Sequence, residues 1–430
     1  MKMDRTYFSE SHQIMRTQVR RFVAREIAPH VDQWEQEKTF PRDLYKKAGD
    51  AGFLGMGYPE AYGGTPCDIF HEVVYAEEII RCGSVGLASS LGCGSIGLPP
   101  VLALGSPEQK ERFIPPVLRG EKIAVLGVTE PGGGSDVANL RTRAVLLGDQ
   151  YVVNGTKTFI TSGTRADLVT TAVRTGGPGS RGISLLLIEK GTPGFAVSRN
   201  IEKMGWHASD TAELSFMDCQ VPVENLLGEE NQGFKGIMVN FEKERLYLAV
   251  EAHTVAEMAL EAATRYARER DAFGRPLTGF QVTRHKLAEM ATGVEAAKRF
   301  NYSVAGMIGQ GQKALKEVCM AKNFATSVCD RVVYNAVQIH GGYGYCREYL
   351  VERLYRDSRL FSIGGGTYEI MNEVISKQMG LWDKDGGRSP YPHHAILGLQ
   401  QHRPRGRSEN RLKGGAGPHR PDRTRHPVAG

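Results

Sequence analysis

Apolar and charged positions repeat with a helical period over the N-terminal part of the chain. Within residues 8–37, charged side chains separate apolar residues that recur close to every 3.6 positions: Ile14, Val19, Phe22, Val23 and Ile27. Similar helical patterns cover residues 43–56, 71–83 and 106–120. Cys82 followed by Gly83 is typical of a helix end. The pattern therefore predicts an N-terminal α-helical domain over residues 1–125.

The pattern changes at Ile123, where short β-branched runs replace the long amphipathic ones. These runs are broken by Gly, Asn-Gly or Pro and cover residues 123–129, 143–161, 167–175, 182–190 and 211–222. Asn154-Gly155 lies between two strand-like runs and predicts a hairpin turn. Strands spaced in this way are typical of a compact sandwich or barrel. We expect a middle β domain over residues 126–229.

From Asn231 onward the pattern is helical again. Three long, Ala-rich segments, residues 233–273, 278–308 and 313–342, each carry one apolar stripe, which is typical of a packed antiparallel bundle. We expect this C-terminal helical domain over residues 230–383. The predicted architecture is multidomain α+β, with helices, then a small β domain, then a helical bundle.

Composition excludes several classes of protein. The chain has 430 residues, of which 41% are hydrophobic and 24% charged, as is ordinary for a soluble globular protein of two or three domains. No apolar run approaches the ~20 residues of a membrane span, and the N-terminus lacks the apolar core of a targeting segment. Seven scattered cysteines without a CxxC pair argue against zinc and against a disulfide framework. We therefore expect a cytoplasmic protein without a metal site.

The net charge of +6 would suggest a nucleic-acid partner if it were spread over the folded part. Residues 386–430 contain nine Lys or Arg and two acidic residues, a balance of +7, which leaves −1 for residues 1–385. Residues 384–430 are rich in Pro, Gly, Arg and His and have no hydrophobic period. Such composition predicts a disordered, solvated extension, with polyanion binding as the alternative, and we expect no nucleic-acid partner.

A glycine-rich segment, Val128–Asp136, begins at the end of the first predicted strand. Its backbone N–H groups could hold an anionic group, and Thr129 and Ser135 add hydroxyls. The three contiguous glycines, 132–134, match neither the GxGxxG fingerprint nor a P-loop. Further phrases follow in the chain: TKTFITSGT (156–164), RDAFGRPLTGFQ (270–281), QIHGGYGYCREYLVERLYRDSR (338–359) and IGGGTYEI (363–370).

Together these phrases resemble the acyl-CoA dehydrogenase family, from about Phe8 to about Trp382. The resemblance implies an N-terminal helical domain, a middle β-barrel and a C-terminal four-helix bundle, with FAD between the last two. It also implies the cofactor-binding residues, which are Leu126, Val128, Thr129, Gly134, Ser135, Phe159, Ile160, Thr161, Arg270, Phe273, Gln281, Gln338, Gly341, Gly342, Thr367 and Glu369.

These residues have different expected roles. The loop from Leu126 to Ser135 would lie beside the flavin ring and pyrophosphate, with Ser135 also facing the thioester end of CoA. Phe159, Ile160 and Thr161 would lie behind the flavin, and Arg270, Phe273 and Gln281 would bind the ADP part. Gln338, Gly341 and Gly342 would reach the FAD of a neighbouring subunit, implying at least a dimer and usually a homotetramer. Thr367 and Glu369 would also line FAD.

Several of these residues have other interpretations. Arg270 could instead cap a helix C-terminus, where its charge suits the dipole. His340 reads as a structural histidine, and Tyr343 and Tyr345 as packing residues. Asp271-Ala272 departs from the family, many members of which have a basic residue and a Thr there, so one contact to FAD is in doubt.

The catalytic base is not where most members of the family carry it. They place a Glu in the loop that is Gly364–Gly366 here, and this chain has Gly365 at that position. Long-chain and isovaleryl-type members instead carry a Glu on a bundle helix, in a Glu-Arg-Leu context that matches Glu244-Arg245-Leu246. The resemblance therefore implies Glu244 as the base that removes the α-proton of an acyl thioester, while the β-hydride passes to flavin N5.

Helix geometry also favours Glu244 over Glu242. The two side chains point about 200° apart, and Glu244 shares an apolar stripe with Ile237, Phe241 and Leu248. A carboxylate on such a stripe is desolvated, which raises its pKa toward a value useful for a base. A surface salt bridge is the other interpretation of Glu244.

The substrate would be held by residues around this base. We expect Glu242 on the substrate-facing flank, Arg245 steering the CoA or orienting the site, and Ser135 at the thioester. A backbone N–H near Gly365–Gly366, with a ribityl hydroxyl of FAD, would polarise the thioester carbonyl.

The expected function is FAD-dependent α,β-dehydrogenation of a medium- or long-chain fatty acyl-CoA, as in β-oxidation, with electrons passing to an electron-transfer flavoprotein. A branched-chain enzyme of isovaleryl or citronellyl type is one alternative. A non-catalytic flavin- or acyl-CoA-binding subunit is another, because the usual base is missing, and a flavin oxidase is a third.

Overall fold

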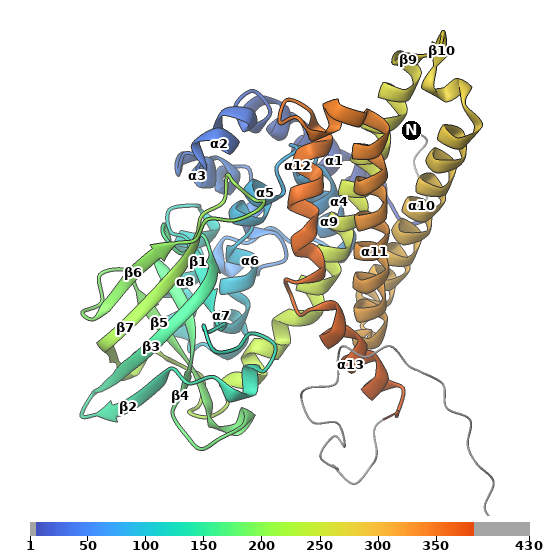
Figure 1. The fold of residues 1–430 in the computed structure, drawn as a ribbon. Helices are drawn as coiled ribbons and strands as arrows, with labels where there is room; N and C mark the ends of the chain where they lie inside the picture. Colours follow the sequence, from blue (N-terminus) through green and yellow to red (C-terminus); the bar gives the residue numbers. More distant parts are fainter. Residues whose placement is uncertain (1–5, 382–430) are drawn as a thin grey trace, which may run out of the picture. The chain divides into compact units, whose positions relative to one another are not determined.

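The computed structural model describes residues 6–381, apart from the side chains of Val239 and Asn240. The basic tail expected at 384–430 lies outside the described residues. Helices, a sheet and a second set of helices follow one another along the chain (Figure 1). This order confirms the predicted architecture.

The N-terminal part is helical throughout. Its α-helices are α1 Glu10–Phe22, α2 Val31–Glu37, α3 Asp43–Asp50, α4 Ile69–Ile80, α5 Val85–Leu91, α6 Gly94–Gly97, α7 Pro99–Leu104 and α8 Pro107–Leu118, with a π-helical turn at Val23–Ile27. α4 ends just before Cys82-Gly83, as predicted, and Gly83 has the left-handed φ of +87° that glycine tolerates at helix ends.

The apolar stripe predicted for α1 is correct except at its start. Val19, Phe22, Val23 and Ile27 are buried, whereas Ile14 is 54% exposed. His12 is buried in its place, which is possible because its ring nitrogens are hydrogen-bonded to the Ser9 N–H (2.8 Å) and to an Asp68 carboxylate oxygen (2.8 Å).

The middle part is an eight-stranded mixed sheet. Its strands are β1 Ala124–Gly127, β2 Arg143–Leu147, β3 Gln150–Thr161, β4 Leu168–Arg174, β5 Ile183–Glu189, β6 Phe195–Asn200, β7 Thr211–Pro222 and β8 Leu226–Leu227. The strand order is β6-β7-β3-β2-β4-β5-β8, and β1 pairs in parallel with β4. β4 and β5 are buried along nearly their whole length, so they form the core of the sheet.

The turn predicted at Asn154-Gly155 is wrong. β3 continues through both residues, and the hairpin turn lies earlier, between Leu147 and Gln150. The pairing of β3 with β7 shifts register between Val153 and Gly155, which marks a bulge. A Cβ atom on Gly155 would lie 2.5 Å from Thr142 Oγ1, so the glycine is needed for close backbone approach rather than for a turn.

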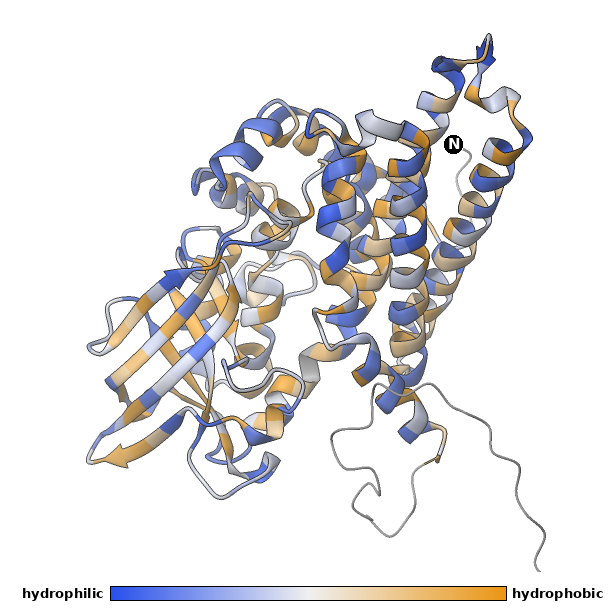
Figure 2. Cartoon of the chain, viewed as in Figure 1, coloured by the Kyte–Doolittle hydropathy of each residue, from blue (hydrophilic) through white to orange (hydrophobic). Residues whose placement is uncertain are grey.

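The C-terminal part contains the longest helices. They are α9 Gly233–Glu269, α10 Gln281–Gly309, α11 Leu315–His340, α12 Leu350–Ser358 and α13 Tyr368–Gln378, with a short hairpin of β9 Asp271–Ala272 and β10 Arg275–Pro276 between α9 and α10. α9 presents a row of fully buried alanines, which let the neighbouring helices approach closely: Ala249, Ala252, Ala256, Ala259 and Ala263. Figure 2 shows polar residues on the outer faces of these helices and apolar residues between them.

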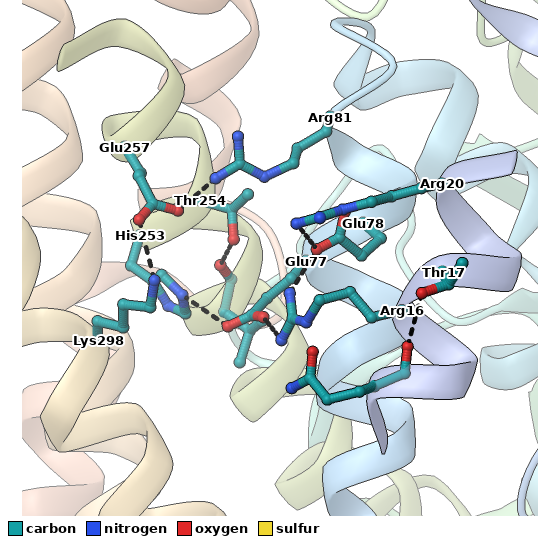
Figure 3. A network of polar contacts seen from close by, with 12 residues as sticks. Arg16, Thr17, Arg20, Glu77, Glu78, Arg81, His253, Thr254, Glu257 and Lys298 are labelled. Atoms are coloured by element: carbon teal, nitrogen blue, oxygen red, sulfur yellow. Dashed lines mark hydrogen bonds and ion pairs between the residues drawn. The ribbon is translucent and has the colours of Figure 1, made fainter. Parts of the chain in front are cut away.

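A buried polar network fixes α9 against the N-terminal helices (Figure 3). The Glu77 carboxylate on α4 contacts Arg16 of α1 at 2.7 Å and His253 of α9 at 3.3 Å, and it accepts a hydrogen bond from the Tyr302 hydroxyl of α10. Burial alone would raise the pKa of Glu77, but the contacts with His253, Arg16 and Tyr302 lower it to about 2. Four helices therefore share one charged carboxylate, which sets the position of α9.

Within residues 6–381, no single helix is long and apolar enough to cross a membrane. One bent pair, Val85–Leu91 with Gly94–Leu104, passes the same test on length and composition only.

Candidate active site

The glycine loop before α13 has a backbone that only glycine adopts easily. Gly365 has φ +63° and Gly366 φ +96°, both in the left-handed region. Thr367 then caps α13, since its hydroxyl oxygen accepts a hydrogen bond from the Ile370 N–H at 3.3 Å. This cap fixes where the loop ends.

The Glu244 carboxylate lies beside this loop. A Cβ atom placed on Gly365 would lie 2.5 Å from Leu248 Cδ1 and 3.6 Å from Glu244 Oε1. The structure thus brings Glu244 of α9 next to the loop position that carries the base in most relatives of the predicted family.

The surroundings of Glu244 suit a base. Its Oε2 is buried and has no hydrogen-bond partner within residues 6–381. Burial raises the pKa of Glu244, and the positive charges of Arg245 and Lys322 partly offset that rise. One oxygen of the carboxylate is therefore unpaired and poorly solvated, which increases its tendency to take a proton.

Two buried cationic side chains bind backbone carbonyls of the glycine loop. Arg245 Nε donates to the Gly365 carbonyl at 3.2 Å, and Lys322 Nζ donates to the Gly366 carbonyl at 2.8 Å. Arg245 also lies 5.1 Å from the Phe241 ring centre. Arg245 thus orients the loop, as one of its two expected roles requires. Sequence reasoning missed Lys322, whose pKa burial lowers to about 8.

The loop leaves two backbone donors available. Neither the Gly365 N–H nor the Gly366 N–H donates a hydrogen bond to any described residue. Each carbonyl shares its peptide plane with the next residue's N–H, so the two cations orient the N–H groups of Gly366 and Thr367. Donation from this loop to a developing oxyanion stays a prediction.

Glu242 has a different environment from Glu244. Its Oε1 accepts a hydrogen bond from the Ala314 N–H at 3.0 Å, at the start of α11. This places a negative charge at a helix N-terminus, where it is favourable. A contact between Glu242 and substrate stays a prediction.

On the middle domain, an ion pair shapes the loop after β1. Lys157 Nζ on β3 contacts Glu130 Oε1 at 2.8 Å and donates to the Val128 carbonyl at 3.0 Å. Glu130 also accepts from the Arg141 and Thr142 N–H groups at 2.6 and 2.8 Å. Sequence reasoning missed Glu130 and Lys157, because their pairing joins the loop after β1 to β3, 27 residues further along the chain.

The predicted cofactor residues on this loop are accessible. Leu126, Val128 and Thr129 are half-buried, and Gly134 and Ser135 are exposed. A Cβ atom on Gly132 or Gly133 would meet nothing within 4 Å, so these glycines are not required by packing within the chain. Open backbone of this kind allows an anionic group to approach closely.

The segment 159–161 projects one aromatic side chain from the sheet. Phe159 is 65% exposed and has φ +59°, at a second register shift between β3 and β7. Ile160 is buried and Thr161 is half-buried. A bulky residue with positive φ is strained, and such strain gathers at functional sites.

Six predicted cofactor residues belong to the segments at the far end of α9: Arg270, Phe273, Gln281, Gln338, Gly341 and Gly342. Arg270, Gly341 and Gly342 line an open pocket of about 510 Å³. The Arg270 guanidinium lies 5.7 Å from the Tyr343 ring centre, and Phe273 is 97% exposed with φ +54°. Gln281 and Gln338 are also exposed. Arg270 stands at the C-cap position of α9 as well, so both interpretations of its position fit.

His340 in the same region is structural. It is buried, its Nδ1 is 2.8 Å from the Ala336 carbonyl, and its ring stacks on Tyr266 at 4.3 Å. Burial lowers its pKa, so its neutral form is favoured. Thr367 and Glu369 belong to the other end, beside the glycine loop, and Glu369 is exposed.

Glu244 and the residues at the tip of α9 are far apart within one chain. From Glu244 to Arg270 the chain runs through 26 residues of α9, about 39 Å at 1.5 Å per residue. Figure 1 shows the β9–β10 tip at the end of α9 away from the sheet. Residues at the tip of α9 therefore cannot share one site with Glu244 of the same chain.

The loop after β1 and the residues at the tip of α9 each fit part of FAD. The Gly132–Gly133 loop and the Gly341–Gly342 turn both offer backbone that meets open space. Phe159 and Phe273 each present an exposed aromatic face, and Arg270 supplies a positive charge for a phosphate.

Family models match three consecutive parts of the chain. They are the acyl-CoA dehydrogenase N-terminal domain at residues 9–121, middle domain at 125–219 and C-terminal domain at 231–380. An acyl-CoA dehydrogenase of Bacillus subtilis is 40% identical over 375 residues, covering 87% of this chain and 99% of its own length.

Solved structures agree with this assignment. A probable acyl CoA dehydrogenase from Mycobacterium abscessus superposes with a TM-score of 0.85 at 53% identity, covering 87% of this chain and all of that one. An acyl-CoA dehydrogenase from Bacillus anthracis in complex with FAD gives 0.83 at 32% identity, covering 88% of this chain and 68% of that one. This chain therefore belongs to the acyl-CoA dehydrogenase family and is an oxidoreductase that uses FAD.

Proposed function

We propose that this enzyme dehydrogenates a medium- or long-chain fatty acyl-CoA to the trans-2-enoyl-CoA, with Glu244 as the base that removes the α-proton. The observation that carries this proposal is the position of Glu244 Oε1, 3.6 Å from a Cβ atom placed on Gly365. A carboxylate there can serve the same reacting atom as a loop Glu would.

The residues around Glu244 support the chemistry. The carboxylate has an unpaired oxygen and a raised pKa, so it can take the α-proton. The free N–H groups of Gly365 and Gly366 can stabilise the charge that develops on the thioester oxygen. Bound FAD would accept the hydride from the β-carbon.

Arg245 and Lys322 have a positioning role in this scheme. They hold the carbonyl oxygens of Gly365 and Gly366, which fixes the orientation of those two peptide groups, including the Gly366 N–H. Their charges also keep a fraction of Glu244 ionised by lowering its pKa against the effect of burial.

The relatives do not decide which acyl group this enzyme accepts. A long-chain specific acyl-CoA dehydrogenase of Rattus norvegicus is 38% identical, and an isovaleryl-CoA dehydrogenase of Oryza sativa is 37% identical. We propose the long-chain type first, because the phrases around Glu244 and Gly365 resemble that branch of the family, with a branched-chain acyl group as the second candidate.

An electron-transfer flavoprotein is the proposed electron acceptor. A subunit of a caffeyl-CoA reductase–Etf complex from Acetobacterium woodii is 38% identical over 372 residues, which supports a partner of that kind.

We also propose a homo-oligomer, with a tetramer as the family's usual form. Residues at the tip of α9, such as Arg270 and Phe273, lie about 39 Å along the helix from Glu244 and would complete the FAD site of a neighbouring subunit. The proposed domains are residues 1–125, 126–229 and 230–383, a division supported by the order of the three family models.

The test is anaerobic bleaching of the flavin by acyl-CoAs of graded length and branching. Glu244→Gln keeps the shape of the side chain and removes the base, so we expect flavin reduction to slow by a factor of about 10²–10⁴. Glu261→Gln on the exposed side of the same helix is the matched control and should reduce flavin at the parent rate.

Unchanged reduction by Glu244→Gln on every thioester would remove Glu244 from the mechanism. If the parent protein binds acyl-CoA but is never bleached, it is a non-catalytic binding subunit. Rapid reoxidation of the reduced protein by oxygen would instead indicate an oxidase.

A further inference from the structure

α9 carries a second carboxyl group on the same face as the proposed base. Glu251 follows Glu244 by seven residues, which is two turns, within about 20° of the same direction and about 10.5 Å further along the axis. Leu248 lies between them and faces the glycine loop, since its Cδ1 is 2.5 Å from the place a Gly365 Cβ would take. The stripe that passes the loop therefore continues to Glu251.

Glu251 is not fully covered by the rest of the protein. It lies deep in the protein, yet part of its surface stays accessible, as for Glu244 and Leu248. No basic side chain within the described chain forms an ion pair with it. Burial, reinforced by the negative charge of Glu244, raises the pKa of Glu251 to about 8. At neutral pH the group is mostly protonated and can both donate and accept a hydrogen bond.

Tyr75 on α4 adds a second polar group there. Its hydroxyl is buried and has no hydrogen-bond partner within residues 6–381. Burial raises the pKa of the Tyr75 hydroxyl, and the charges of Cys82 and Glu251 add to that rise. The Tyr75 ring packs against Phe53 with centres 5.6 Å apart. A buried hydroxyl is rarely left unpaired, so this one indicates a ligand atom that pairs with it.

The distance along α9 sets which atom of the substrate would arrive there. With bond lengths near 1.5 Å and angles near 111°, an extended carbon chain advances about 1.25 Å per carbon. An acyl chain whose α-carbon lies at Glu244 and that follows α9 would then reach Glu251 about eight carbons later, near its tenth carbon.

We propose that Glu251 and Tyr75 form a polar end to the acyl cavity and select acyl-CoAs that carry a hydroxyl or carbonyl oxygen near the tenth carbon. This inference rests on the proposed dehydrogenase function. A plain alkyl end would cover the Glu251 carboxyl and leave the buried Tyr75 hydroxyl without a partner, whereas an oxygen atom could form hydrogen bonds with both.

The test compares decanoyl-CoA with 10-hydroxydecanoyl-CoA on the FAD-loaded enzyme. Binding is measured by calorimetry in a Glu244→Gln background, so that turnover does not consume the ligand. We expect the hydroxylated thioester to bind at least about 10-fold more tightly. Adding Glu251→Leu should reduce this ratio to about one, and adding Glu251→Gln, which keeps the hydrogen-bonding capacity, should preserve it. Tyr75→Phe should lower the ratio partially.

Two results would overturn the inference: equal binding of the pair by the parent, or a preference that survives Glu251→Leu. ω-Hydroxylated thioesters of six, eight and twelve carbons locate the site, and a preference that peaks at six would contradict the distance argument. If the Glu244→Gln enzyme still reduces flavin, Glu244 is not the base. The preference for 10-hydroxydecanoyl-CoA over decanoyl-CoA is then measured as a ratio of kcat/KM values, which tests Glu251 separately.

Discussion

Replacing Gly365 by Ala should damage the site through two separate effects. The added Cβ would lie 2.5 Å from Leu248 Cδ1, well inside the ~3.5–4.0 Å separation of carbon atoms in contact. The residue would also have to keep φ +63°, a conformation that L-residues other than glycine adopt with strain.

The magnitude follows from these two effects. Left-handed backbone costs about 1–2 kcal/mol for a residue with a Cβ, and overpacking costs about 1–3 kcal/mol. The sum is about 2–5 kcal/mol of lost stability. Displacement of Leu248 would also disturb the neighbouring Glu244, so we expect kcat/KM to fall as well.

The assay is denaturant unfolding of the FAD-loaded protein, with Gly364→Ala as the matched control. A Cβ on Gly364 meets only Leu360, at 3.5 Å, and its backbone is not left-handed, so Ala should change stability by less than about 1 kcal/mol. Combining Gly365→Ala with Leu248→Ala removes the overlap and leaves the strain. The two changes should therefore be non-additive by about 1 kcal/mol or more.

Equal stability of Gly365→Ala and Gly364→Ala would refute the reasoning. If the effects of Gly365→Ala and Leu248→Ala on stability are additive within about 0.5 kcal/mol, steric overlap with Leu248 is rejected as a cause. Backbone strain at position 365 would then remain as the explanation.

Two further predictions concern charge. Lys322→Met removes a charge that lowers the pKa of Glu244, so the acid limb of kcat/KM should move to higher pH; an unmoved limb would show that Lys322 does not influence the base. Glu77 has a folded-state pKa of about 2 against an ordinary 4.5, so its carboxylate adds about 3 kcal/mol of stability above pH 4.5, which is lost as the pH falls toward 2. Thermal melting should therefore fall more steeply between pH 5 and 3 for the parent than for Glu77→Gln, and parallel curves would contradict this.

The partial burial of Glu244, the proposed base, was predictable because a helix has a fixed period. Ile237, Phe241 and Leu248 define an apolar stripe, and Glu244 interrupts it, so its partial burial follows from spacing alone. The Glu-Arg-Leu context then selected it over Glu242. The structure adds its proximity to the glycine loop, more than a hundred residues later in the chain.

Other parts of the site left no local signal. Lys322 reads as an ordinary charged position on a helix, and its partner is a backbone carbonyl on a distant loop. Asn154-Gly155 fits a turn and a bulge equally well in local terms; the contact with Thr142 on another segment decides between them. Long-range contacts of this kind cannot be inferred from spacing along one chain.

Because the space around Gly365 is crowded, the proposed catalytic carboxylate could not easily have changed position between the helix and the loop during evolution. An acid added to the loop while Glu244 remains would set two carboxylates side by side, and one would be forced to stay protonated. Removing Glu244 first would leave an ancestor without the proposed base. Leu248 would also have to shrink, because its methyl group occupies the space of the new side chain. Migration of the acid therefore requires linked substitutions at three positions, and isolated intermediates on that path would be poor enzymes.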